Sequence, residues 1–203
     1  TAQNTQGVTG VHLVPPHFVA QQIKAVFADV RVDAVKIGMI ANAGIAEAVA
    51  ETLAPHRGIP IVVDPVMIAK GGAALLDPQA VDALTKHLLP LATLLTPNLP
   101  EAAALLHEEV AESREQMASQ AERLRALGPA AVLVKGGHLE SNESPDILAT
   151  DSGRHWFEAK RVPTKNTHGT GCTLSSALAA ELAKGASPQA AVSTAKTYLA
   201  QAV

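Results

Sequence analysis

The stretch Ile61-Val62-Val63-Asp64-Pro65 decides the fold class that this sequence predicts. Three β-branched residues favour a buried strand, and the acid followed by proline ends it. Upstream of this strand, Asn42 can cap a helix with apolar residues at four-residue spacing from Ile45 to Leu53. A buried strand that follows a helix with one apolar face is typical of an α/β protein.

The same alternation continues in both directions from this stretch. Further strands are predicted near 8–13 and at 34–37, 91–95, 131–134, 147–149 and 155–157, and further helices begin near 16, 78, 98, 113, 172 and 188. The turn Asp151-Ser152-Gly153 joins the last two strands as a hairpin. We therefore expect one α/β domain over residues 1–203, with a mostly parallel sheet between helices.

The composition excludes several classes of partner. Hydrophobic residues make up 47% of the 203 residues, and the formal net charge is −3 without any basic block. Nucleic acid and anionic membranes are therefore not expected as partners, and no apolar run approaches the roughly 20 residues of a membrane helix. No signal peptide is seen, and the single cysteine, Cys172, fits a reducing compartment such as the cytoplasm.

Polar clusters fall where the predicted strands end. They are Gly38-Met39, Asp64-Pro65, Thr96-Pro97-Asn98, Lys135-Gly136-Gly137-His138 and the segment 166–172. Ligands of open α/β sheets bind at the carboxyl ends of the strands, so these clusters predict one shared site.

The segment Asn166-Thr167-His168-Gly169-Thr170-Gly171-Cys172-Thr173 carries the strongest chemical signal. It runs into an apolar helix, and glycines at a helix start leave backbone amides open to an anion such as phosphate. The field of a helix N-terminus also favours a thiolate, so Cys172 could accept a proton from an attacking hydroxyl. The alternative is a glycine-rich helix entry beside an inert thiol.

Four polar residues at or near other strand ends allow two interpretations each. Asn98 and Glu101 could hold Mg²⁺, mostly through water, or simply begin a helix as cap and third-position acid. Lys135 could contact a phosphate oxygen or be a solvated lysine before a tight turn. Asp64 could orient metal or phosphate, or form a turn before proline.

The remaining candidates suit an organic ring. Val66 and the thioether of Met39 could line a ring, and Gln3 could exchange hydrogen bonds with a heterocycle. The alternatives are core packing for the first two and a polar turn for Gln3. The histidines His138 and His168 are interpreted as polar surface rather than as acid–base groups.

Taken in order, these motifs resemble the hydroxymethylpyrimidine/phosphomethylpyrimidine kinases. The resemblance rests on Thr1-Ala2-Gln3-Asn4-Thr5, Lys36-Ile37-Gly38-Met39, Asp64-Pro65-Val66-Met67, Thr96-Pro97-Asn98-Leu99-Pro100-Glu101, Lys135-Gly136-Gly137-His138 and Lys165-Asn166-Thr167-His168-Gly169-Thr170-Gly171-Cys172-Thr173. It implies a ribokinase-like three-layer α/β/α fold, ATP with Mg²⁺, a homodimer, and two successive phosphorylations of a pyrimidine used in thiamine biosynthesis.

The resemblance also implies a role for each matching residue. Gln3, Met39 and Val66 would bind the pyrimidine. Asn98, Glu101 and Asp64 would organise the metal, and Asn98, Lys135, Thr170 and Gly171 would bind the nucleotide. Lys135 and the amides from Gly169 to Cys172 would hold the transferring phosphate, and Cys172 would be the catalytic base.

Two departures keep other functions open. Family members begin with a further strand, glycine-rich turn and helix before the position of Thr1, and continue beyond Val203, so we expect segments missing at both ends. A non-catalytic ligand-binding remnant is therefore one alternative. A pyridoxal kinase of the same superfamily is another, although some of those relatives carry a second cysteine near the position of Ala69.

Overall fold

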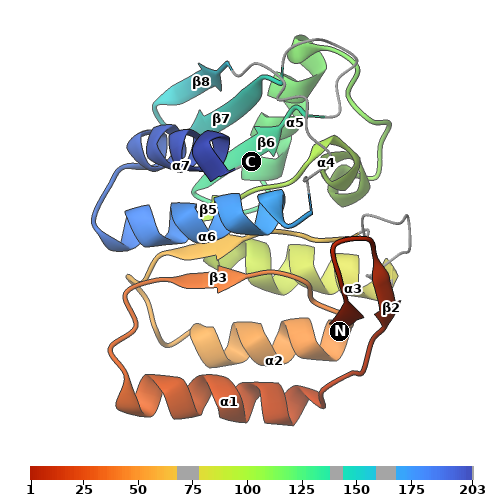
Figure 1. Cartoon of the computed structure of the whole chain (residues 1–203), viewed down its shortest axis with the longest axis vertical. Coiled ribbons are helices and arrows are strands. Elements are labelled where there is room, and N and C mark those ends of the chain that lie inside the picture. The colour runs from red at the N-terminus through yellow and green to blue at the C-terminus, as the bar shows by residue number, and fades with distance from the viewer. Residues whose placement is uncertain (68–77, 138–143, 159–167, 203) are drawn as a thin grey trace.

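A six-stranded sheet organises the fold in the computed structural model, which describes residues 1–67, 78–137, 144–158 and 168–202 (Figure 1). Its strands are, in spatial order, β3 (Val35–Ile37), β4 (Ile61–Val63), β5 (Leu94–Leu95), β6 (Ala131–Lys135), β7 (Asp146–Thr150) and β8 (Gly153–Phe157). The first four strands are parallel, and β7 and β8 join as an antiparallel hairpin. This confirms the mostly parallel sheet that the sequence predicts.

Helices cover both faces of this sheet. They are α1 (Pro16–Asp29), α2 (Ala43–Leu53), α3 (Pro78–Ala83), α4 (Leu99–Leu106), α5 (Arg114–Arg125), α6 (Thr170–Ala183) and α7 (Pro188–Ala202). One apolar cluster joins Ile61 and Val63 to the face covered by α2, α4 and α5, and a second joins Val62 to α6 and α7. Successive strand residues thus point to opposite layers, and the buried β-branched run supplies both cores.

Local capping signals explain several helix starts. The Asn42 side chain accepts a hydrogen bond from the amide of Ile45 (2.9 Å), as predicted. Ser113 and Gln116 form the expected reciprocal capping box of α5. Each side chain satisfies a backbone amide that the first helical turn leaves without an intrahelical partner.

Two predicted strands differ from the structure. Near residue 8, only β2 (Val8–Gly10) forms, and it pairs with β1 (Ala2–Gln3) in a separate two-stranded ribbon, while the apolar Leu13 stays exposed. Within 91–95, the strand is confined to β5, because a π-helical turn (Leu84–Leu88) and a 3₁₀ turn (Leu89–Leu91) extend α3. In both places the reason is that apolar residues occur in turns as well as in strands, so a short apolar run alone does not define a strand.

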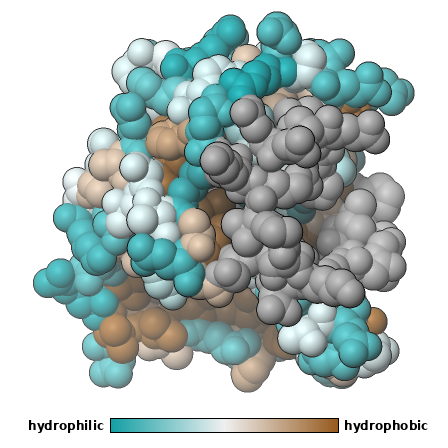
Figure 2. Space-filling model, turned by 45° about the horizontal axis from the view of Figure 1, so that its top comes forward, coloured by the Kyte–Doolittle hydropathy of each residue, from teal (hydrophilic) through white to brown (hydrophobic). Residues whose placement is uncertain are grey.

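Apolar and hydrophilic side chains occupy different regions of the exposed surface. Figure 2 shows apolar side chains gathered toward the lower part of the face in view, and hydrophilic ones above. Three side chains on or just after α1 are about half exposed: Phe18, Val26 and Val30. No helix in the parts of the chain that the structure describes has the length and apolar character to cross a bilayer.

Candidate active site

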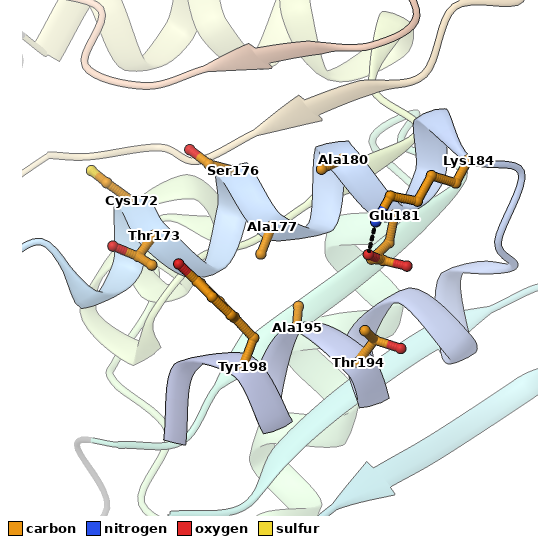
Figure 3. Close-up of a pocket in the computed structure, with 10 residues that line it drawn as sticks. All are labelled: Cys172, Thr173, Ser176, Ala177, Ala180, Glu181, Lys184, Thr194, Ala195 and Tyr198. Atoms are coloured by element: carbon orange, nitrogen blue, oxygen red, sulfur yellow. Dashed lines mark hydrogen bonds and ion pairs between the residues drawn. The ribbon is translucent and has the colours of Figure 1, made fainter. Parts of the chain in front are cut away.

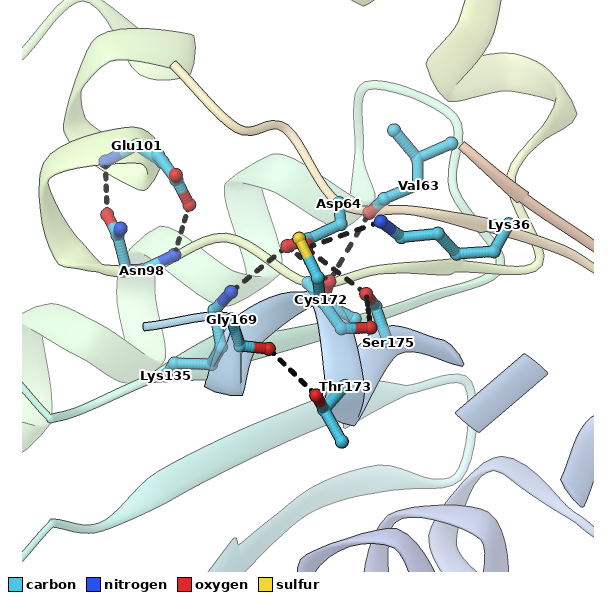
Figure 4. Close-up of polar contacts among 11 residues, drawn as sticks. Lys36, Val63, Asp64, Asn98, Glu101, Lys135, Gly169, Cys172, Thr173 and Ser175 are labelled. Carbon is cyan, nitrogen blue, oxygen red and sulfur yellow. Dashed lines mark hydrogen bonds and ion pairs between the residues drawn. The ribbon is translucent and has the colours of Figure 1, made fainter. Parts of the chain in front are cut away.

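A buried carboxylate, Asp64, ties together four elements at the carboxyl ends of the parallel strands (Figure 4). Asp64 directly follows β4, and its Oδ1 accepts hydrogen bonds from Lys135 Nζ (3.0 Å) and Thr96 Oγ1 (3.1 Å). Its Oδ2 accepts from Ser175 Oγ (3.1 Å), which lies on α6. A buried ion pair is stable only when its remaining hydrogen-bonding positions are filled. For the pair of Asp64 with Lys135, the further donors are Thr96, directly after β5, and Ser175 of α6.

The N-terminus of α6 lies against this carboxylate. Gly169 caps the helix with φ of 80°, a left-handed conformation that favours glycine, and it has no side chain to cover the first turn. A Cβ placed on Gly171 would lie 3.5 Å from Lys135 Nζ, so the lysine touches that turn. Because the helix dipole and Lys135 are both positive here, the helix mouth favours an anion.

Cys172 is an exposed thiol in the first turn of α6. A shallow groove of about 660 Å³ lies between α6 and α7. It begins at Cys172 and Thr173, beside Tyr198 of α7, and extends past Ala180 to Lys184 (Figure 3). The thiol therefore stands at the end of an open groove, beside the helix mouth and within reach of solvent-borne ligands.

Asn98 and Glu101 form a reciprocal cap at the start of α4. The Asn98 side chain accepts from the Glu101 amide, and the Glu101 carboxylate accepts from the Asn98 amide, both at 2.8 Å. The helix-start interpretation is thus confirmed, while the metal role stays a prediction. Burial raises the pKa of Glu101, with a further rise from Asp64, whereas Lys135 and the amides of Asn98 and Met67 act in the opposite direction.

A divalent cation fits this cap only as a partly hydrated ion. The amide and carboxylate oxygens are hard donors of the kind Mg²⁺ accepts, and Asn98 lies beside Lys135 through a parallel bridge. Within the described ranges, no group of three or more acidic, histidine or cysteine side chains is arranged to hold a metal. Asp64 is occupied by Lys135, Thr96 and Ser175, so its metal role would require those contacts to rearrange.

Contacts of the next residue, Gly136, fix the backbone at Lys135. The Gly136 amide donates to Asp146 Oδ1 (2.9 Å), and the other oxygen of Asp146 pairs with Lys196 of α7. A Cβ on Gly136 would lie 1.9 Å from the carbonyl oxygen of Pro145. The glycine is therefore required for close approach of β6 to the segment before β7.

The predicted ring-binding residues lie in three different segments. Gln3 is exposed on β1, Met39 is half-buried shortly after β3, and Val66 is half-buried shortly after β4. Figure 1 places the β1–β2 ribbon on the side of the molecule where the parallel strands end. Their substrate-binding roles stay predictions. His168 is half-buried, and the predictions for His138, for residues 159–167 and for Ala69 lie outside the described residues.

Sequence reasoning assigned no role to three residues that the structure brings to Asp64. Thr96 and Ser175 bond its carboxylate, and Lys36 Nζ of β3 lies 4.0 Å from its Oδ2. One signal was visible: Lys36 is a lone charge in the buried strand predicted at 34–37. Ser175 gave a weaker signal, because it is the one hydroxyl among the buried residues of α6, which are otherwise leucine and alanine.

Comparisons with known proteins find one family model and close relatives over the whole chain. The phosphomethylpyrimidine kinase family matches residues 1–203. The chain is 52% identical over 202 residues to the hydroxymethylpyrimidine/phosphomethylpyrimidine kinase of Salmonella typhimurium, covering 100% of this chain and 76% of that protein.

Two solved structures are similar over nearly the whole chain. A phosphomethylpyrimidine kinase from Clostridium difficile has a TM-score of 0.84 and 39% identity, covering 98% of this chain and 81% of that one. A pyridoxal kinase from Staphylococcus aureus in complex with AMP-PCP and pyridoxal has a TM-score of 0.85 and 32% identity, covering 94% and 68%.

Proposed function

The chain belongs to the phosphomethylpyrimidine kinase family, and from this premise we propose that it catalyses two successive phosphoryl transfers from ATP. The first acts on the hydroxymethyl group of 4-amino-5-hydroxymethyl-2-methylpyrimidine, and the second converts the monophosphate to the diphosphate. The protein is a phosphotransferase of thiamine biosynthesis, as the sequence predicts. Its fold is the predicted ribokinase-like one.

One observation carries this proposal: Lys135 lies against the first turn of α6, the same turn that presents Cys172. Phosphoryl transfer depends mainly on positioning and on stabilising negative charge. Lys135 and the amides from Gly169 to Gly171 would supply that charge stabilisation. Cys172 would take the proton of the hydroxymethyl group as its oxygen bonds to the γ-phosphorus and the bond to the leaving ADP oxygen breaks.

Asn98 and Glu101 would hold Mg²⁺, largely through water, beside the nucleotide phosphates. The bound ion would neutralise charge on those phosphates. Such a cation would stabilise the ionised form of Glu101, which burial makes costly in the free protein. AMP-PCP in the staphylococcal pyridoxal kinase supports ATP as the nucleotide of this fold.

Pyridoxal kinase is the second candidate, and a specific observation supports it. The pyridoxal kinase structure superposes as well as the pyrimidine kinase structure does, so the fold does not separate the two substrates. The 52% identity to the Salmonella protein favours the pyrimidine. A non-catalytic remnant is disfavoured, because Lys135, Cys172 and the Asn98–Glu101 cap converge at one edge of the sheet.

The test is an assay of the intact protein with ATP and Mg²⁺ against three acceptors. We expect turnover of the free pyrimidine and of its monophosphate, and weaker turnover of pyridoxal. Preferential turnover of pyridoxal would replace the pyrimidine assignment, and no turnover of any acceptor would favour the ligand-binding remnant.

The predicted homodimer and cytoplasmic location are part of this proposal. Sedimentation equilibrium of a preparation of this chain should then give twice its mass of 21.0 kDa. The unpaired Cys172 thiol, which the mechanism uses in its reduced form, is the feature that supports a reducing compartment.

A further inference from the structure

Lys36 is a second lysine at the Asp64 carboxylate, on the opposite side from Lys135 (Figure 4). Its Nζ lies 4.0 Å from Asp64 Oδ2, and its side chain is 21% exposed. Lys135 reaches the same carboxylate from β6, whereas Lys36 comes from β3, with β4 and β5 between them. The two ammonium groups therefore approach one buried acid from the two sides of the site.

Lys36 is not needed to satisfy Asp64. Both carboxylate oxygens already accept hydrogen bonds, from Lys135, Thr96 and Ser175, and at 4.0 Å the Lys36 contact is an ion pair without a hydrogen bond. Asp64 is its only ion-pair partner among the described residues. Among the described residues, Lys135 is hydrogen-bonded to Asp64 and also interacts with Glu101, whereas the Lys36 ammonium makes only its 4.0 Å ion pair and can therefore face an additional anion.

The strand end is shaped to admit the Lys36 side chain. In an extended chain, residues 36 and 38 lie on the same face. A Cβ on Gly38 would lie 2.7 Å from Lys36 Nζ. A side chain at position 38 would thus displace the ammonium group. Glycine there leaves the lysine lying along the end of β3, directly before Met39, the predicted pyrimidine contact.

We propose that Lys36 binds the phosphate of the monophosphate acceptor in the second transfer, and thereby sets the preference between the two acceptors. This inference rests on the proposed function. The free pyrimidine is neutral, whereas a phosphomonoester carries about −1.5 to −2 charges at pH 7. Lys36 is the cation on the acceptor side, and Lys135 serves the nucleotide side in both transfers.

The two transfers differ in their need for a base. In the second, an already ionised phosphate oxygen of the acceptor bonds to the γ-phosphorus, the bond from that phosphorus to the bridging oxygen breaks, and ADP leaves with the electron pair. No hydroxyl proton has to be removed, so Cys172 matters less than it does in the first transfer. Charge neutralisation by Lys36 matters more.

The experiment compares kcat/KM of the Lys36→Met variant for the two acceptors, with Lys24→Met, an exposed lysine of α1, as the matched control. The ratio of kcat/KM for the monophosphate to that for the free pyrimidine should fall roughly 10- to 150-fold, mainly through KM, which corresponds to losing a hydrogen bond between charged groups. Lys36→Arg should restore most of that ratio, and Lys24→Met should leave it unchanged.

Equal losses for both acceptors, or an unchanged ratio, would overturn the role of Lys36. Heat denaturation of each variant shows whether it is folded. If Lys36→Met does not fold, Lys36→Gln, which is polar but uncharged, replaces it and should show the same fall in the ratio. If wild-type protein phosphorylates neither acceptor, the proposed function fails instead, before any variant is compared.

Discussion

At the scale of single residues, Cys172 makes the most direct prediction. Cys172→Ala should lower kcat with the free pyrimidine roughly 10²- to 10⁴-fold, because a positioned base is lost. Nucleotide affinity should change little, since the thiol is exposed at the helix mouth. Steady-state kinetics and calorimetric titration with AMP-PCP check the two halves. Wild-type turnover in the variant would remove the base assignment.

Glu101 allows its two roles to be separated. Glutamine at this third helical position can still accept the Asn98 amide, so Glu101→Gln keeps the capping box and removes only the charge. We therefore expect normal folding with a raised Mg²⁺ requirement. An unchanged metal titration would reduce Glu101 to a helix cap, and Glu101→Ala, which loses both, serves as the comparison.

The same variant makes a prediction about pH and stability. The folded state raises the pKa of Glu101 above the ordinary 4.5, so it binds its proton more tightly than the unfolded chain does. This favourable contribution is complete below the unfolded pKa and is lost as pH rises through the raised value. In urea unfolding, the free energy of unfolding of the wild type should therefore fall relative to that of Glu101→Gln as the pH rises from the unfolded pKa of Glu101 through its folded pKa. Above that range the difference between the two proteins should be constant. A constant difference at every pH would contradict the cause.

At the scale of elements, the junction of β6 with the segment before β7 has the closest approach found at any described glycine. Gly136→Ala would place a Cβ 1.9 Å from the carbonyl oxygen of Pro145, which is backbone and cannot rotate away. We expect a loss of about 3 kcal/mol or more in the free energy of unfolding. In Gly137→Ala the nearest atom is Ser144 Oγ at 3.4 Å, so this control should lose less than about 1 kcal/mol. Similar losses in both variants would argue against the steric cause.

Helix starts could be predicted from the sequence because their causes are local. Asn42, Ser113 and Asn98 each bond an amide three residues away, and their spacing is visible in the sequence. The strand at Ile61–Val63 was equally clear, because three buried β-branched residues favour one conformation. Strand limits near residues 8 and 91 were less clear, because apolar residues also fill turns.

The composition of the site was harder to predict, because its contacts span most of the chain. Asp64 meets Lys135 at a separation of 71 residues and Ser175 at 111. Periodicity placed Lys135 and Asp64 at strand ends, and hence at one edge of the sheet, but it contains no information on which donors satisfy that carboxylate. The roles of Ser175, Thr96 and Lys36 became visible only once β3, β5, β6 and α6 were placed together.

At the scale of the whole molecule, the site is a meeting point of both halves of the chain, so a ligand bound there should stabilise the entire fold. AMP-PCP with Mg²⁺ at 100 times its dissociation constant should add about 2.7 kcal/mol to the free energy of unfolding. For a domain of this length, each kcal/mol raises Tm by about 2–4 °C, so we expect a shift of roughly 5–11 °C in a thermal scan.

Lys135→Met tests whether that stabilisation depends on nucleotide binding at the proposed phosphate site. The variant will start from a lower Tm, because Asp64 loses its buried partner, so each protein is compared with its own ligand-free form at one fixed AMP-PCP concentration. Losing a hydrogen bond between charged groups weakens binding roughly 10- to 150-fold, which should remove about half or more of the wild-type shift. Lys24→Met should keep the full shift, since its lysine is exposed on α1. A full shift in Lys135→Met would mean that the nucleotide is held elsewhere, and the anion site at the mouth of α6 would lose its main support.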